Sequence, residues 1–327
     1  MKTRQERIRE AYVSKEMLST DYRRKMITFM EEKLNEDAPA DITSDAVIKG
    51  SARVHGIIEA KAEGILAGLE EILKFYSRHN IKAKALKKDG DRLEKSDIIA
   101  ELYGSEKDFL KVERTGLNVL QRMSGVATNT KRVAEIVAGY GAFVVGTRKT
   151  LLSCIDKKAI CLGSGLPHRM GLYDAILIKD NHLAAIREEG TEHAIEEAIS
   201  RAYAARPTYK PSFIEIEVST KQDAIRAAKK YKELREDTYA KKCASSATET
   251  PFVIMFDNMK PGEIKKTIKE LKRLGLYDYA LFEASGGINE KNLKQYAAAG
   301  TDVLSMGAIT HSVKALDISQ KIVKREK

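Results

Sequence analysis

The sequence predicts an α/β protein, an irregular TIM-like α/β barrel with an N-terminal α/β sandwich domain. Three observations support this prediction. Short apolar runs alternate with helical stretches in the second half of the chain, a pattern typical of β–α units around a parallel sheet. Short strands with glycine breaks occupy the region from 51 to 105. Polar and charged residues follow each of the later apolar runs, where barrel enzymes place their active sites.

Length and composition indicate an ordinary globular protein. The 327 residues are 43% hydrophobic and 32% charged, which suits a barrel plus a smaller domain. No stretch approaches the roughly 18 uninterrupted apolar residues of a membrane span. The charged start of the chain has no apolar segment for secretion, so we expect a cytoplasmic protein. The three cysteines, Cys154, Cys161 and Cys243, lack metal-ligand spacing and are expected to be reduced.

The net charge of +10 has two interpretations. Lys and Arg are spread along the chain instead of forming a stripe, and no zinc-finger, RRM-like or basic-zipper pattern is present. This distribution favours a site for a strongly anionic small substrate. A non-enzymatic basic protein that binds nucleic acid stays open as an alternative, although it would leave the acidic residues at the strand ends without a role.

The N-terminal region predicts a mixture of short elements. Apolar residues at helical spacing predict a helix within 16–34, and Pro and Asp residues predict a loop over 37–44. We expect the first dozen residues to form a loose extension. Further predictions are a helix at Leu69–Tyr76, a turn at Asp89-Gly90 and a long helix over Phe109–Val137, in which Ser124-Gly125 is a candidate break.

Six apolar runs predict the strands of the barrel. Each is short and is followed by a stretch with helical character. The helices include Gln222–Glu236, Gly262–Leu274 and Lys291–Ala299. The strands are AFVVGT (142–147), AILIKD (175–180), FIEIEV (213–218), FVIMFD (252–257), YALFEAS (279–285) and DVLSMG (302–307).

The strand ends carry the candidate site. Clustered cations repel one another unless a polyanionic ligand lies among them. Gly-rich strand ends offer backbone N–H groups to a phosphate. In FIEIEV, Glu215 and Glu217 share the inward face; we assign Glu217, nearer the rim, to function and Glu215 to structure. The candidate residues are Arg148, Lys149, His168, Arg169, Lys179, His182, Glu217, Asp257, Glu283, Ser285, Gly286, Gly287, Ser305 and Gly307.

These groups suit transfer of a phosphoribosyl group to an anionic acceptor. Acids can stabilise a positive ribosyl centre, while cations and glycines hold the anionic parts of the substrates. No Ser/His/Asp or Cys/His arrangement stands out, and no GxGxxG or Walker loop is present, which disfavours a dinucleotide oxidoreductase or a P-loop kinase. A phosphate-binding barrel lyase or isomerase stays open as a second alternative.

Several motifs, matched in order, resemble the quinolinate phosphoribosyltransferase family, the decarboxylating nicotinate-nucleotide pyrophosphorylases. The resemblance extends over most of the chain from about residue 36. The motifs are VERTGLNVLQRMSGVAT (112–128), GTRKT (146–150), HRMGLYDAILIKDNH (168–182), IEIEV (214–218), IMFDNM (254–259) and LFEASGGINEKNLKQYAAAGTDVLSMGAITHS (281–312).

The resemblance implies a fold, a reaction and a partner. The fold is an N-terminal sandwich (1–112), a barrel (113–311) and a C-terminal segment (312–327) that returns to the sandwich. The enzyme is a pentosyltransferase, nicotinate-nucleotide diphosphorylase (carboxylating). It converts quinolinate and 5-phosphoribosyl 1-diphosphate to nicotinate mononucleotide, diphosphate and carbon dioxide, with magnesium as cofactor. The family also implies a homodimer whose sites are shared across the interface.

The resemblance also implies roles for single residues, with Lys149, Glu217 and Asp257 as the catalytic set. Glu217 and Asp257 would hold ribose hydroxyls, directly or through magnesium. Arg114 would reach the site from the partner subunit. The quinolinate carboxylates and the diphosphate would be bound by Arg148, Lys149, His168, Arg169 and Lys179, and the 5′-phosphate by Ser285, Gly286, Gly287, Ser305 and Gly307.

The segment 151–167 departs from the family pattern. Leu151-Leu152-Ser153-Cys154 replaces the usual Pro-Gly-x-Arg, Gly163-Ser164-Gly165 replaces three glycines, and Pro167 replaces Asn. The changes lie beside the expected acceptor pocket. Nicotinate, or the acceptor of a molybdenum-linked relative, is therefore the alternative acceptor, while the intact Lys179-Asp180-Asn181-His182 favours quinolinate.

Overall fold

The computed structural model describes residues 2–12, 20–50, 52–241 and 250–326. Cys243 and the first residues of the helix predicted within 16–34 lie outside these ranges. In the described part of the chain, no helix is both long enough and apolar enough to cross a membrane.

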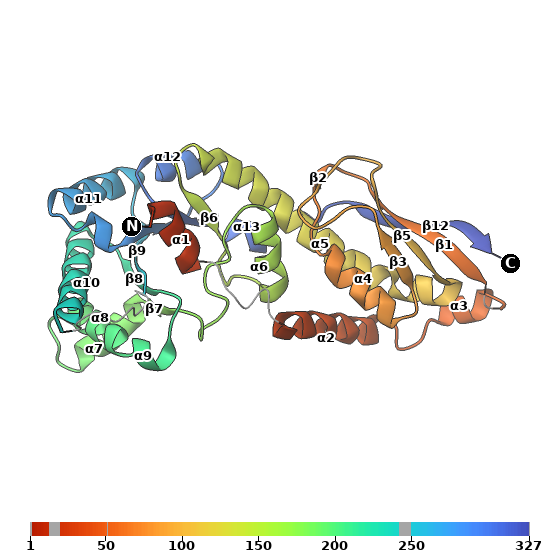
Figure 1. The fold of residues 1–327 in the computed structure, drawn as a ribbon, viewed down its shortest axis with the longest axis horizontal. Helices are drawn as coiled ribbons and strands as arrows, with labels where there is room; N and C mark the ends of the chain where they lie inside the picture. The colour runs from red at the N-terminus through yellow and green to blue at the C-terminus, as the bar shows by residue number, and fades with distance from the viewer. Residues whose placement is uncertain (1, 13–19, 51, 242–249, 327) are drawn as a thin grey trace. The chain divides into compact units, whose positions relative to one another are not determined.

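The chain forms two compact units (Figure 1). The barrel unit comprises residues 1–14, 133–148 and 166–308, and the sandwich unit comprises 15–132, 149–165 and 309–327. Because each unit combines distant parts of the chain, the continuous domain ranges 1–112, 113–311 and 312–327 stay a prediction.

The barrel unit is built around a parallel six-stranded sheet with the order β6-β11-β10-β9-β8-β7. All six strands lie within the predicted apolar runs, so these strands are confirmed. β6 and β7 stand at the two edges, and a bridge between Val145 and Leu166 extends the β6 edge. The strands are β6 (Phe143–Val145), β7 (Ile176–Ile178), β8 (Ile214–Val218), β9 (Phe252–Asp257), β10 (Leu281–Ser285) and β11 (Val303–Ser305).

Helices follow most of these strands, as in repeated β–α units. The helices predicted around 222–236, 262–274 and 291–299 are confirmed within a few residues at each end. The helices are α7 (Asp180–Glu188), α8 (Ala194–Ala204), α9 (Arg206–Tyr209), α10 (Lys221–Lys241), α11 (Pro261–Arg273), the 3-10 helix η2 (Tyr277–Tyr279), α12 (Leu293–Ala298) and α13 (Ala308–His311).

Helix α1 (Arg4–Tyr12) belongs to the barrel unit, so the prediction of a loose extension is wrong. The helix begins with a capping box. The amide of Glu6 donates to Thr3 Oγ1 at 3.2 Å, and the amide of Thr3 donates to Glu6 Oε2 at 2.7 Å. Its apolar stripe packs with inward-facing residues at or before the N-terminal ends of the strands, so α1 covers that end of the barrel. This cluster includes Ile8, Ala11, Tyr12, Phe213, Val253, Leu281 and Val303.

The sandwich unit contains a four-stranded antiparallel sheet with the order β12-β1-β5-β3. The last strand comes from the end of the chain and pairs with β1 along most of its length. The elements are α2 (Thr20–Asp37), α3 (Ile42–Val47), β1 (Arg53–Ala60), β2 (Gly64–Ile65), α4 (Leu69–Arg78), β3 (Lys82–Ala85), β4 (Arg92–Leu93), β5 (Ile98–Ser105), α6 (Ser153–Leu162) and β12 (Ile318–Glu326).

Two further local predictions need correction. The segment 37–44 is not all loop, because the side chain of Asp41 accepts a hydrogen bond from the amide of Ser44 and caps α3. The long helix α5 (Glu106–Ala138) is continuous through Ser124-Gly125. Ser124 Oγ accepts a hydrogen bond from the amide of Ala67 at 3.0 Å, and Gly125 lets the backbone at Lys314 approach where a Cβ would collide. Ser124 and Gly125 therefore allow other segments of the chain to pack closely against α5.

Candidate active site

The C-terminal ends of the parallel strands gather most of the predicted site residues. Asp257 ends β9 and Ser285 ends β10, and these two residues pair in register. Ser305 ends β11, the neighbour of β10 in the sheet. Because all strands are parallel, these side chains belong to the same end of the barrel. We call this group the rim: Arg148, Arg169, Lys179, Glu217, Asp257, Ser285, Gly286, Gly287 and Ser305.

An ion pair joins Lys179 at the end of β7 to Glu217 on β8. Lys179 Nζ lies 2.5 Å from Glu217 Oε1, and the two side chains are 42% and 15% exposed. Each charge is thus compensated while the pair stays open to solvent, and a ligand can reach both groups. The interior position predicted for Glu217 fits this geometry.

The Lys179-Asp180-Asn181-His182 segment forms the start of α7. His182 Nδ1 accepts a hydrogen bond from the backbone amide of Lys179 at 2.9 Å. His182 therefore caps the helix, which holds Lys179 at the end of β7. A strand that suits the core ends in these polar residues because they begin the next helix and place one cation on the rim.

Arg169 brings a buried cation to the rim. Its side chain is only 6% exposed and donates to the carbonyl of Ala175 at 3.4 Å. Burial lowers the pKa of Arg169, and the positive charge of Arg148 lowers it further. Two guanidinium groups that repel each other form a site in which an anion gains energy from both.

The turn after β10 depends on glycine. Gly286 has φ +92° and Gly287 has φ +63°, both in the left-handed region that side chains disfavour. A Cβ on Gly286 would also collide with the side-chain oxygen of Asn258, the residue after Asp257. The backbone at Gly286 therefore lies against the end of β9, and a turn of this kind can present N–H groups to an anion.

Glu283 does not lie on the rim, although it follows an apolar run. It is fully buried inside the barrel and accepts a hydrogen bond from the hydroxyl of Ser305. Because that hydroxyl donates its proton to Glu283, it offers only acceptor lone pairs in other directions. The predicted contact of Ser305 with a phosphate must then come from its backbone amide or from a turned hydroxyl.

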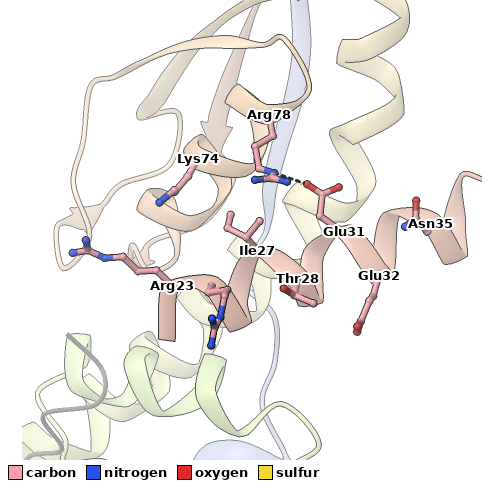
Figure 2. Close-up of a pocket in the computed structure, with 9 residues that line it drawn as sticks. Arg23, Ile27, Thr28, Glu31, Glu32, Asn35, Lys74 and Arg78 are labelled. Carbon is pink, nitrogen blue, oxygen red and sulfur yellow. Dashed lines mark hydrogen bonds and ion pairs between the residues drawn. The ribbon is translucent and has the colours of Figure 1, made fainter. Parts of the chain in front are cut away.

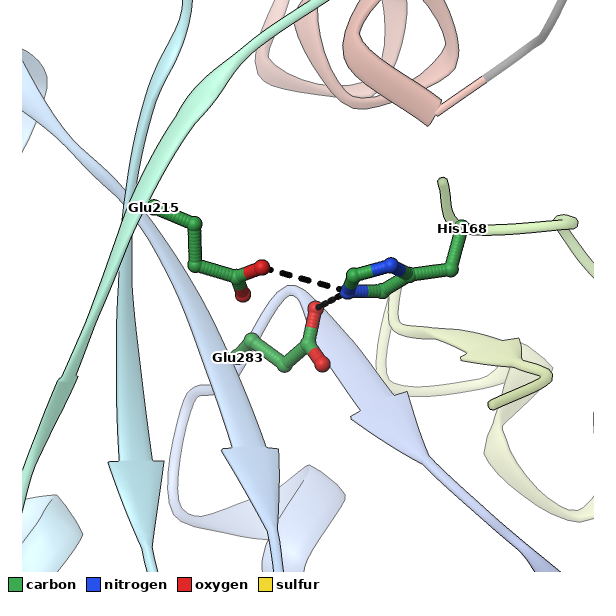
Figure 3. A group of neighbouring side chains, drawn as sticks. All are labelled: His168, Glu215 and Glu283. Atoms are coloured by element: carbon green, nitrogen blue, oxygen red, sulfur yellow. Dashed lines mark ion pairs between the residues drawn. The ribbon is translucent and has the colours of Figure 1, made fainter. Parts of the chain in front are cut away.

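His168 lies in the same buried cluster, as Figure 3 shows. Its Nε2 is 3.2 Å from Glu215 Oε2 and 3.4 Å from Glu283 Oε2. Its Nδ1 accepts a hydrogen bond from the amide of Arg169 at 2.7 Å. Both ring nitrogens thus face protein groups, so direct binding of a ligand by His168 stays a prediction. We call His168, Glu215 and Glu283 the buried triad.

The triad holds a proton in a dry environment. Burial disfavours charged His168, but Glu283 and Glu215 raise its pKa to about 9. The Arg169 amide lies against Nδ1, and Nε2 is the ring nitrogen whose proton faces both carboxylates. Burial and the charge of Glu283 raise the pKa of Glu215 to about 7. Hydrogen bonds and His168 lower the pKa of Glu283 despite its burial. We therefore assign the remaining proton to Glu215.

Replacing Glu215 by glutamine is expected to change how stability depends on pH. The pKa of Glu215 rises from 4.5 to about 7 on folding, so the unfolded chain ionises first as pH increases. Between these two values the carboxyl group increasingly disfavours the folded state, and glutamine removes that effect. The gain in free energy of unfolding should grow with pH by about 1–3 kcal/mol, part of the full effect being offset by weaker support of His168.

Denaturant titrations of both proteins across pH 4.5 to 7 measure this difference. The matched control is Glu188→Gln on α7, where the side chain is exposed. A constant difference between Glu215→Gln and the unchanged protein over that range would contradict the assignment of the proton.

Two of the predicted residues lie in the sandwich unit. Arg114 is exposed on α5, and Lys149 is exposed at the start of the segment 149–165. The carbonyl of Lys149 accepts a hydrogen bond from the hydroxyl of Thr310 at 3.2 Å. Thr150 donates to Asp156 at 2.6 Å, and Asp156 in turn forms two hydrogen bonds with Arg122.

The departures in segment 151–167 have structural counterparts. Leu152 to Leu162 form the N-cap and body of α6. Lys158 on this helix lies 2.7 Å from Glu71 and 3.1 Å from Asp89, so its charge is used within the sandwich unit. The charge of Lys158 is thus neutralised by these carboxylates, and Lys158 is unsuited to bind the acceptor substrate.

Two groups of residues offer ligands to a cation. Magnesium prefers oxygen ligands and keeps several waters, and Glu217 and Asp257 are carboxylates with partial exposure that fit this preference. The ligand atoms of the buried triad lie within 4.8 Å of one another. The triad suits magnesium poorly, because it includes an imidazole, is closed to water and has the oxygens of Glu283 occupied by hydroxyl donors.

The sandwich unit contains a separate pocket that includes none of the predicted site residues. It lies between α2 and α4, with a volume of about 540 Å³ (Figure 2). Charges of both signs line it, and Arg78 pairs with Glu31 at 3.0 Å. None of the residues that line it belongs to the predicted site.

Two contributors, Tyr12 and Arg122, are not among the residues predicted from the sequence. Tyr12 donates a hydrogen bond to Glu283 at 2.6 Å, and Arg122 anchors the Thr150 loop through Asp156. The Thr3–Glu6 capping box, followed by Ile8, Ala11 and Tyr12 at helical spacing, is a sequence signal that predicts α1. No comparable signal marks Arg122.

Comparisons with known proteins match nearly the whole chain. The C-terminal domain of quinolinate phosphoribosyl transferase matches residues 126–321, and its N-terminal domain matches residues 41–124. A probable nicotinate-nucleotide pyrophosphorylase [carboxylating] of Methanocaldococcus jannaschii is 38% identical over 87% of this chain and 92% of its own length. A protein of the same name from Bacillus subtilis is 36% identical over 88% of this chain and 90% of its own length.

Solved structures agree with this similarity. NadC from Streptococcus pyogenes has a TM-score of 0.76 and 29% identity, covering 92% of this chain and 98% of that chain. The nicotinate-nucleotide pyrophosphorylase of Francisella tularensis has a TM-score of 0.75 and 26% identity, covering 92% of this chain and 96% of that chain. The predicted fold class, an irregular α/β barrel with a sandwich domain, is confirmed.

Proposed function

Because this chain belongs to the quinolinate phosphoribosyltransferase family, we propose that it transfers the phosphoribosyl group of 5-phosphoribosyl 1-diphosphate to quinolinate. The products are nicotinate mononucleotide, diphosphate and carbon dioxide, which is a step of de novo NAD biosynthesis. The observation that supports this most is the rim, where the Lys179–Glu217 pair lies in the same barrel unit as the buried Arg169 and the Gly286-Gly287 turn.

The reaction uses the charges of the rim in two stages. The ring nitrogen of quinolinate attacks the ribose C1 atom as the bond to diphosphate breaks, and positive charge develops on the ribose. Glu217 and Asp257 stabilise this charge, while Arg148, Arg169 and Lys179 bind carboxylates and diphosphate. The carboxylate beside the ribosylated nitrogen then leaves as carbon dioxide. Its electron pair stays on the ring carbon, which takes a proton from water.

Magnesium is the proposed cofactor, with Glu217 and Asp257 as the groups that would bind it directly or through water. When bound, it would neutralise the diphosphate and assist its departure. The rim acids keep their own function of stabilising the ribose. Isothermal titration of magnesium into the protein with and without 5-phosphoribosyl 1-diphosphate measures this binding independently of turnover.

The proposal includes a homodimer in which Arg114 completes the site of the partner subunit. Arg114 is exposed on α5, as such a role requires. Lys149 is proposed as a catalytic cation on a backbone held by Thr310. The cytoplasmic location stays a prediction.

In the decisive experiment, the purified protein is incubated with magnesium, 5-phosphoribosyl 1-diphosphate and either quinolinate or nicotinate. We expect nicotinate mononucleotide and carbon dioxide from quinolinate and no product from nicotinate. Product from nicotinate alone would mean that the altered segment 151–167 has changed the acceptor. No product from either would overturn the proposal in favour of a different acceptor or a lyase.

A further inference from the structure

Helix α1 is anchored to the barrel at both ends. At its start, Arg4 forms two hydrogen bonds with Asp302, at 2.5 and 2.6 Å, and its guanidinium lies 4.0 Å above the ring of Tyr277. Asp302 also accepts a hydrogen bond from the amide of Phe282 at 2.7 Å. The position of α1 is therefore tied to the backbone of β10, the strand that carries Glu283.

At its other end, α1 places Tyr12 inside the barrel. The side chain is 1% exposed, and its ring contacts His168 edge-on with centroids 5.4 Å apart. The Tyr12 ring also packs at 4.9 Å from Phe213. Its hydroxyl donates to Glu283 Oε2 at 2.6 Å. Burial and the charge of Glu283 raise the pKa of Tyr12 far above its ordinary value, so the phenol keeps its proton.

Glu283 connects Tyr12 to the rim. One carboxylate oxygen accepts from Ser305, which ends β11, and the other accepts from Tyr12 and faces His168. His168 precedes Arg169 and accepts a hydrogen bond from its amide. A rotation of the Glu283 carboxylate would therefore change its hydrogen bond with Ser305. Through His168, it would also shift the backbone of Arg169.

We propose that Tyr12 of helix α1 is a positioning residue for the active site, because its hydroxyl holds Glu283 in the orientation that Ser305 and His168 require. The N-terminal helix thus supports the rim from the opposite end of the barrel. It acts through Glu283 and does not itself contact substrate. The kinetic test of this inference rests on the proposed function, whereas the spectroscopic test does not.

The test compares Tyr12→Phe with Tyr279→Phe. Each removes one hydroxyl, and Tyr279 donates to Glu236 at 2.8 Å on the outside of the barrel unit. Tyr12→Phe is expected to raise the KM of both substrates roughly tenfold while kcat stays within about twofold, because Lys149, Glu217 and Asp257 are untouched. Tyr279→Phe should leave all of these values unchanged. A purely structural loss would lower kcat through fewer folded molecules at constant KM.

The histidine NMR signals provide the second measurement. The signal of His168 is assigned by its loss in His168→Gln, and it should shift in Tyr12→Phe and stay in place in Tyr279→Phe. An unmoved His168 signal, unchanged KM values, or a fall in kcat alone that parallels a loss of folded protein would each overturn the inference. If the unchanged protein proves inactive with both acceptors, the His168 signal still decides whether Tyr12 positions the triad.

Discussion

Replacing Glu217 by glutamine is expected to lower kcat by about 10²- to 10³-fold, the usual loss for one preorganised electrostatic contact with a transition state. Glutamine keeps the shape and hydrogen-bonding reach of the side chain but removes the charge that opposes the ribosyl cation. Steady-state kinetics with quinolinate and 5-phosphoribosyl 1-diphosphate measure the effect.

The loss should appear mainly in kcat, because the ground-state substrate carries little positive charge at the ribose. Substrate binding also changes, since Lys179 loses the partner that lies 2.5 Å away. Glu192→Gln, an exposed glutamate before α8, is the matched control and should behave like the unchanged protein. A decrease of less than about threefold in Glu217→Gln would remove Glu217 from the catalytic set.

Mixing two inactive variants is expected to restore activity if the sites are shared between subunits. We expect Arg114→Ala and Glu217→Gln each to impair every site in their own homodimers severely. In a mixed dimer, one site contains both defects and the other contains neither. Random exchange of subunits should therefore recover about a quarter of the normal activity.

The experiment unfolds and refolds the two variants together and compares the mixture with each variant refolded alone. Size-exclusion chromatography with light scattering checks that a dimer forms. Mixing Glu217→Gln with Asp257→Asn serves as the control. Both residues belong to the same barrel, so every site in a mixed dimer carries one of the two substitutions, and no activity should be recovered. Recovery absent from the first mixture, with a dimer present, would place Arg114 in its own subunit's site or outside the site.

The sequence alone predicted the parallel strands and most of the rim. Short apolar runs such as FVIMFD and IEIEV, each followed by a helical stretch, predict buried strands, and period-two alternation places Glu215 and Glu217 on one face. Polar residues directly after such runs lie at one end of a parallel sheet whatever the details of packing. Local pattern was therefore sufficient for Asp257, Ser285 and Lys179.

Local pattern failed where contacts join distant parts of the chain. Ser124-Gly125 has the composition of a helix break, yet it lies within a continuous α5 because another segment packs closely against it. The charged residues 1–12 have the composition of a loose tail, but Ile8, Ala11 and Tyr12 lie at helical spacing and pack at the N-terminal end of the barrel. Propensity is weak evidence when tertiary packing supplies the stabilisation.

The family, the order of the strands along the chain and the residue types at the rim thus follow from the sequence. Which polar residues face the substrate side and which lie in the interior depends on how the strands assemble in three dimensions. Glu283 and His168 belong to motifs that suggest a rim position, yet they meet Glu215 and Tyr12 in a dry cluster. Burial of charge is possible only with partners, and partners far apart in the sequence become visible only when the strands are assembled.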